Sequence, residues 1–192
     1  MHPSQALETW WDCTNPMPEL AGLRAITARL LALPESATPP ASRAYWITFA
    51  AKLAPLPTRD TPSGKALAPA EIFKAKSNVE NPELYAVFPF RLCSFEKDTR
   101  DLGIQALKHR WDRGNFGWRQ DDISMAYLGL TDDARQNLVA RARNHDQNSR
   151  FRWQQPWIWR QGWKMFPKRF VCRGTQLGST PPQTERDWKR LA

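Results

Sequence analysis

Apolar residues recur at spacings of three and four along this chain, and prolines end the runs that they form. Leu20, Leu23, Ile26 and Leu30 follow this spacing, and Pro34 ends the run. Such spacing places side chains on one face of an α-helix, which can bury that face against a neighbour. Proline lacks the amide hydrogen that a helix interior needs, so it marks the helix end. The pattern therefore predicts a helix over residues 20–33.

Four further segments carry similar signals. Apolar residues at 45, 46, 49 and 53 predict a second helix from about Ser42, and residues 55–70, rich in Pro, Thr, Ser and Gly, predict an extended surface loop. Residues 90–155 contain no proline, and helices are predicted there at about 100–111, 123–130 and 131–143. We find no convincing run of alternating polar and apolar residues. The body, residues 1–149, is thus predicted to be all-α, with long loops between four or five helices.

Positive charge is concentrated in the last part of the chain. The net charge is +9, of which residues 150–192 contribute +8 and residues 1–149 only +1. The same segment holds five of the ten tryptophans. Basic and aromatic residues together can bind single-stranded nucleic acid. Because glycines and prolines interrupt the segment and no periodicity gathers these residues on one face, we predict a poorly ordered tail, and a nucleic-acid partner is not favoured.

Several classes of protein are not indicated. There is no apolar run of about 18 residues, so no membrane partner is expected, and no secretory signal precedes the body, which leaves a cytoplasmic location by default. Cys13, Cys93 and Cys172 are widely spaced and predict buried or idle thiols. No metal site and no cofactor are predicted, because the histidines and cysteines form no ligand motif.

Four ordered stretches carry a resemblance to a known family: ETWWDCTNP at 8–16, NVENPELYAVFPF at 78–90, HRWDRGNFGWRQDD at 109–122 and AYLGLTD at 126–132. In this order they resemble the catalytic domain of bacterial proteins akin to glycoside hydrolase family 95, the α-L-fucosidase family. The resemblance covers residues 8–150 and implies part of an (α/α)6 barrel, the six-hairpin toroid. It implies an inverting hydrolase acting on a glycoside or oligosaccharide. The better known fucosidases have histidines in the segment that corresponds to residues 78–83, and this chain has none there. The resemblance therefore does not specify which sugar is the substrate.

The resemblance covers only the second half of the barrel, so the chain is expected to be a fragment without hydrolytic activity of its own. Its open barrel edge is expected to expose apolar surface and to favour self-association. A carbohydrate-binding remnant without catalysis, and a nucleic-acid binder acting through residues 150–192, stay as alternatives.

Carboxylates beside aromatic residues supply the candidate site. Glycoside hydrolysis needs one carboxyl group to protonate the leaving oxygen and a base to activate water, and aromatic rings stack on sugar faces. The catalytic candidates are Asp12, Glu19, Asp121 and Asp122. The substrate-binding candidates are Trp11, Glu80, Asn81, Glu83, Trp118 and Gln120. We expect Glu80, Glu83, Asp121 and Asp122 to lie near one another at one end of the helices.

Each candidate has a structural alternative. Asp121 and Asp122 are also typical of the first turn of a helix, where carboxylates interact with the helix dipole, and so is Glu83 after Pro82. The tryptophans at 10, 11 and 118 are also typical of a core. Asp112, which follows Trp111, is also typical of a surface ion pair, with Arg110 or Arg113 as its partner.

Overall fold

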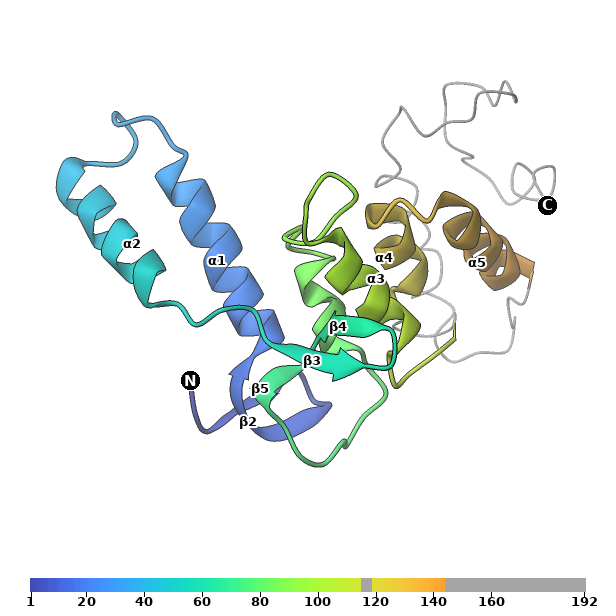
Figure 1. The fold of residues 1–192 in the computed structure, drawn as a ribbon. Helices are drawn as coiled ribbons and strands as arrows, with labels where there is room; N and C mark the ends of the chain where they lie inside the picture. Colours follow the sequence, from blue (N-terminus) through green and yellow to red (C-terminus); the bar gives the residue numbers. More distant parts are fainter. Residues whose placement is uncertain (115–118, 144–192) are drawn as a thin grey trace, which may run out of the picture. The chain divides into compact units, whose positions relative to one another are not determined.

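The computed structural model describes residues 1–114 and 119–143, so the predictions for Trp118 and for the tail at 150–192 lie outside the described residues. The chain divides into two compact units, Met1–Asp112 and Arg113–Ala192. Figure 1 shows the elements of both units in sequence colours. The two units are described separately.

Unit 1 contains β-structure, which overturns the all-α prediction. Strands β1 (Ser4–Ala6), β2 (Trp10–Pro16) and β5 (Ala70–Ile72) form an antiparallel sheet in the order β1-β2-β5. Strands β3 (Thr58–Thr61) and β4 (Gly64–Leu67) form a separate hairpin. Among the described residues, 44% are helical and 16% are in strands. The prediction of a partial (α/α)6 barrel is therefore wrong for this chain.

The strands escaped prediction for a physical reason. They are three to seven residues long, too short for alternation to be recognised. In β2, Trp11 and Asp12 are both exposed, and Asp12 has φ +53°, so the strand breaks the period of two. The supposed surface loop at 55–70 instead holds the β3–β4 hairpin, whose turn uses Gly64 at φ +120°.

The predicted helices are confirmed. Unit 1 contains α1 (Met17–Leu31), α2 (Pro40–Lys52), the short 3-10 helix η1 (Pro82–Ala86) and α3 (Arg100–Lys108). Unit 2 contains α4 (Asp121–Tyr127) and α5 (Thr131–Arg143), which pack against each other. Both α1 and α2 have a proline in their first turn, where no amide hydrogen is required. None of the described helices is long and apolar enough to cross a membrane.

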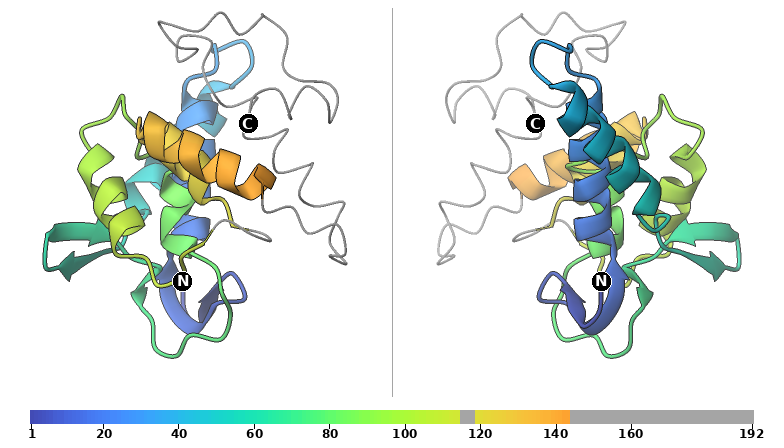
Figure 2. Two further views of the ribbon diagram at one scale, coloured as in Figure 1. Left: turned by 90° about the vertical axis from the view of Figure 1, so that its right-hand side faces the viewer. Right: turned by 90° about the vertical axis from the view of Figure 1, so that its left-hand side faces the viewer.

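The core of unit 1 lies between α1, the β1–β2–β5 sheet and η1. The buried residues of α1 include Met17, Leu20, Ala21 and Ala25, whereas Ile26 is 55% exposed. Small residues let α1 approach η1 closely, and a Cβ atom built on Gly22 would lie 3.1 Å from the Phe90 ring. Figure 2 shows α2 running beside α1. The sheet and η1 thus hold the N-terminal half of α1 in place.

Candidate functional site

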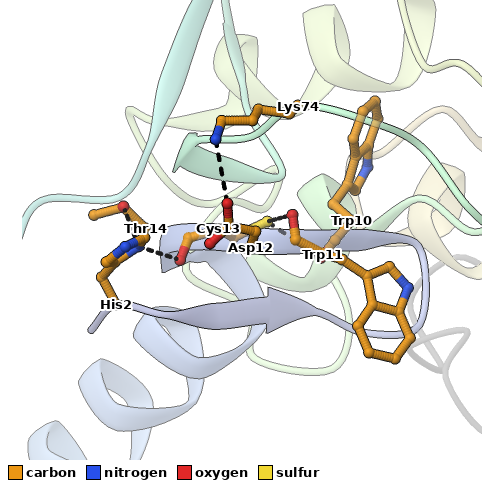
Figure 3. A network of polar contacts seen from close by, with 7 residues as sticks. All are labelled: His2, Trp10, Trp11, Asp12, Cys13, Thr14 and Lys74. Atoms are coloured by element: carbon orange, nitrogen blue, oxygen red, sulfur yellow. Dashed lines mark hydrogen bonds and ion pairs between the residues drawn. The ribbon is translucent and has the colours of Figure 1, made fainter.

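Two of the predicted site residues lie next to each other on β2. Trp11 is 53% exposed, and its Nε1 donates a hydrogen bond to the Glu8 carbonyl at 3.2 Å. The Asp12 carboxylate forms an ion pair with Lys74 at 3.2 Å, with more than half of each side chain exposed. Figure 3 shows Trp10 and Trp11 leaving the strand on opposite sides. An ion pair this exposed contributes little to stability, and Asp12 is held at the surface, beside an exposed aromatic ring.

The other side chains in Figure 3 fix the strand itself. His2 Nδ1 lies 3.3 Å from the Cys13 carbonyl and 3.1 Å from Thr14 Oγ1. The Cys13 thiol donates to the Trp10 carbonyl at 3.2 Å, and burial raises the pKa of this thiol. Cys13 and Cys93 are both buried and free, as predicted, while Cys172 lies outside the described residues. A buried thiol of raised pKa is a poor nucleophile, so this network is structural.

Two carboxylates of unit 1, one on α1 and one just before η1, act electrostatically on the hydroxyl group of Tyr85. Burial raises the pKa of the half-buried Tyr85 phenol, and the charges of Glu80 and Glu19 raise it further. Glu19 lies in the first turn of α1, Glu80 precedes η1, and Tyr85 lies within η1. The contact between α1 and η1 brings them together. This cluster is called the Tyr85 site.

The two carboxylates of the Tyr85 site differ in their surroundings. Glu80 Oε2 accepts a hydrogen bond from Thr9 Oγ1 at 3.0 Å. Glu19 is exposed by its accessible surface, yet desolvation of the covered part of its side chain raises the pKa of its carboxyl group, against the smaller effect of its own backbone amide. One carboxylate is thus held by a neutral donor, and the other is shifted toward its protonated form.

The other two predicted site residues of this region, Asn81 and Glu83, interact with groups inside unit 1. Asn81 Nδ2 donates to the Asp112 carbonyl at 2.8 Å, and the Asp112 amide donates to Asn81 Oδ1 at 3.2 Å. Glu83 is fully buried in the first turn of η1, where its charge raises the pKa of Arg59 against the larger, lowering effect of burial. This placement favours the helix-acid interpretation of Glu83. Asp112 is not at the surface, as its predicted ion pair required, because it is 7% exposed, and it pairs with Lys76 at 2.6 Å.

An aromatic cluster adjoins the Tyr85 site through this Asn81–Asp112 contact. The rings of Trp10, Phe73 and Trp111 lie 5.0 to 5.8 Å apart between centroids, and the Arg59 guanidinium stacks 4.1 Å from the centre of Trp111. Trp10 is buried, which fits the core interpretation, while Trp111 is 42% exposed. Edge-to-face packing of these three rings holds together the segments around residues 10, 73 and 111.

In unit 2, Asp121 and Asp122 are 2% and 5% exposed in the first turn of α4, and Gln120 occupies the N-cap position. Arg141 Nη1 lies 3.5 Å from Asp122 Oδ1, and Arg141 Nη2 donates to the Arg119 carbonyl at 2.7 Å. Burial raises the pKa of Asp122, and the charge of Arg141 opposes this rise. This placement favours a structural role in the helix start.

Sequence reasoning missed Arg141, although a signal exists. Arg141 lies three residues after Leu138 and seven after Ala134, both buried, and therefore on the buried face of α5. A basic residue on such a face indicates a buried carboxylate partner. Glu80 and Glu83 belong to unit 1 and Asp121 and Asp122 to unit 2, so the proximity of the two pairs stays a prediction.

Among the described residues, no group of three or more His, Cys, Asp and Glu side chains is arranged to hold a metal ion. No protein-family model, curated protein or solved structure matches the chain. The resemblance to glycoside hydrolase family 95 accordingly stays a prediction. What can be argued about function rests on the side chains described above.

Proposed function

We propose that unit 1 binds carbohydrate at the Tyr85 site, in the manner of a glycoside hydrolase subsite. The observation that carries the proposal is the contact between α1, which bears Glu19, and η1, which bears Tyr85 and follows Glu80, so that both carboxylates act on one half-buried tyrosine. Sugars present hydroxyl groups together with apolar ring faces, and they are bound by carboxylates and aromatic side chains placed side by side. The four stretches that resemble the fucosidase family include Glu80 and Tyr85, which supports the same proposal.

The two carboxylates suit different parts of such a site. A carboxyl group whose pKa is raised by desolvation keeps its proton at higher pH and can donate it to a glycosidic oxygen. Glu19 meets that requirement, because desolvation raises the pKa of its carboxyl group. Glu80, anchored by Thr9, suits a hydrogen-bond acceptor for sugar hydroxyls. Tyr85 supplies both a ring face and a hydroxyl group.

Binding and hydrolysis are separate claims. Inverting hydrolysis needs its acid and base about 6.5–9.5 Å apart, on opposite sides of the bond. We propose binding for this chain and predict no turnover by the chain alone. An assay on aryl α-fucosides and α-galactosides tests the second claim, and turnover that Glu19→Gln abolishes would contradict it.

Binding is tested with the 192-residue chain and oligosaccharides containing α-linked fucose or galactose, followed by heteronuclear NMR titration. We expect shifts centred on Tyr85. Affinity should fall about 10-fold or more in Glu80→Gln, because hydrogen bonds to charged groups are worth about 1.5–3 kcal/mol, and less in Glu19→Gln and Tyr85→Phe, which remove weaker contacts. Glu35→Gln, an exposed acid after α1, is the matched control and should bind normally. Absence of sugar-dependent shifts, or an equal loss in Glu35→Gln, would refute the proposal.

A further inference from the structure

The segment that carries Glu80 is fastened at two points to one residue. Residues 73–81 join β5 to η1, and an isolated bridge pairs Lys76 with Trp10. Lys76 Nζ lies 2.6 Å from Asp112 Oδ2, and Asn81 hydrogen-bonds the backbone of the same Asp112 in both directions. We propose that Lys76, Asn81 and Asp112 form a clamp that positions Glu80 in the Tyr85 site. The inference rests on the proposed function for its consequence in sugar binding.

The geometry of the Asn81 amide makes it the central part of the clamp. Its Nδ2 donates to the Asp112 carbonyl and its Oδ1 accepts from the Asp112 amide, at 2.8 and 3.2 Å. Two bonds to one residue imitate the pairing between neighbouring strands and fix both the position and the rotation of the amide. Glu80 is the residue immediately before it, so its backbone is fixed at that end.

The ion pair holds the other end of the segment. The side chains of Lys76 and Asp112 are 26% and 9% exposed, so the pair is shielded from solvent more than the Lys74–Asp12 pair, whose side chains are 72% and 56% exposed. Shielding from solvent strengthens the attraction between the two opposite charges. Between the two fastened ends, the Ser77 amide donates to the Thr9 carbonyl at 2.7 Å.

The clamp matters because the middle of the segment has little side-chain packing to order it. Ser77 and Val79 are exposed, and their side chains provide little packing. A segment that is free to move must be ordered when a ligand binds, and each immobilised side chain costs about 0.5–1.5 kcal/mol. Holding Glu80 beforehand removes part of that cost. Asn81 is thereby assigned a positioning role in place of the predicted contact with substrate.

Tyr85 provides a readout that a merely structural contact would not move. The Glu80 charge raises the pKa of Tyr85, so a variant that releases Glu80 lowers this pKa. The chain has three tyrosines, and ¹³C-labelled tyrosine in NMR separates Tyr85 from Tyr45 and Tyr127. Glu80→Gln gives the reference for complete removal of the charge.

Two clamp variants separate loop release from a direct effect of charge. Asn81→Ala changes no charge, and we expect a lower pKa of Tyr85 and up to about tenfold weaker sugar binding. Lys76→Met removes a positive charge, which by itself would raise the pKa of Tyr85, so a fall in this variant must come from a structural change. A fall that disappears when Glu80→Gln is also present comes from movement of Glu80, and one that persists comes from greater exposure of Tyr85. Lys74→Met, in the exposed pair on the same segment, should leave both quantities unchanged.

The outcomes distinguish the clamp from the proposed function. An unchanged or raised pKa of Tyr85 in both folded clamp variants, as judged by their amide spectra, would refute the clamp whatever the sugar binding. If Asn81→Ala does not fold, Lys76→Met alone decides, because the Asn81 hydrogen bonds remain in it. A lowered pKa in a chain whose wild type binds no sugar would support the clamp and refute the proposed function. A lowered pKa together with weaker binding supports both.

Discussion

Helices α1 and α2 lie side by side and have similar apolar content, but only α1 belongs to a core. Seven of the fifteen residues of α1 are buried, whereas none of the thirteen residues of α2, all of them described, is buried. α1 packs against β2 and η1 as well as α2, and the principal contacts of α2 are with α1. The aromatic residues of α2 instead contact one another, as Tyr45 does with Trp46 at 4.9 Å between ring centroids. Burial follows from the neighbours that the fold provides, and apolar sequence alone does not decide it.

The largest expected effect comes from shortening one apolar side chain in each helix. Leu20 in α1 is 1% exposed, and Leu20→Ala should lower the free energy of unfolding by about 3 kcal/mol, because it removes buried contacts and leaves a cavity. Ile47 in α2 is 55% exposed, and Ile47→Ala should change stability by less than about 0.5 kcal/mol. Urea denaturation followed by circular dichroism measures both. Similar losses in the two variants would mean that α2 is buried against something in solution.

A smaller effect is expected where the two helices are tied together. The Arg24 guanidinium donates hydrogen bonds to the carbonyls of Leu53 and Ala54, just beyond the C-terminus of α2, at 2.6 to 3.2 Å. Arg24→Met keeps most of the side-chain length, and it should cost about 1–2 kcal/mol, given that the site is half-buried. The loss should appear as faster amide hydrogen exchange in α2 than in the N-terminal half of α1. Arg29→Met, an exposed change on α1, is the control. Equal acceleration in both helices would show that Arg24 supports the core and not the pairing.

The same contrast explains what the sequence could and could not predict. Helices were predictable because their signals are local, namely the spacing of apolar residues and the prolines that bound each run. The buried face of α1 could not be predicted in the same way, because it consists largely of small residues, such as Ala21 and Ala25, which do not form an apolar stripe in the sequence. The sheet was hidden for a related reason, since β2 pairs with β5 through Thr14 and Ile72, which lie far apart in sequence.

The candidate site was likewise predictable only in part. Glu19 and Glu80 were predictable as carboxylates near aromatic residues, and the resemblance marked their surroundings. The roles of Tyr85 and of the Asp112 contacts could not be predicted, because they depend on which side chains the fold brings together. Residue type indicates which chemistry is available, whereas the partner of each group depends on tertiary contacts. The carboxylates of Asp121 and Asp122 are both buried, and that of Asp122 pairs with Arg141, which residue type alone did not indicate.

The smallest expected effect on stability comes from the exposed side of α2, where the change should appear in association instead. Tyr45 is 60% and Ile47 55% exposed, and apolar surface of this kind favours contact between molecules. We predict concentration-dependent self-association of the chain in sedimentation velocity, weakened in the double variant Tyr45→Glu, Ile47→Glu, with stability at low concentration changed by less than about 0.5 kcal/mol. Added acids bring the net charge of +9 closer to zero, which by itself would promote association. Weaker association would therefore have to come from the lost apolar surface. The variant Ser42→Glu, Thr48→Glu adds the same charge to exposed polar positions of α2 and should associate at least as strongly as the unchanged chain. If both double variants remain as associated as the unchanged chain, the contact between molecules lies elsewhere, and the exposure of α2 has no consequence for assembly.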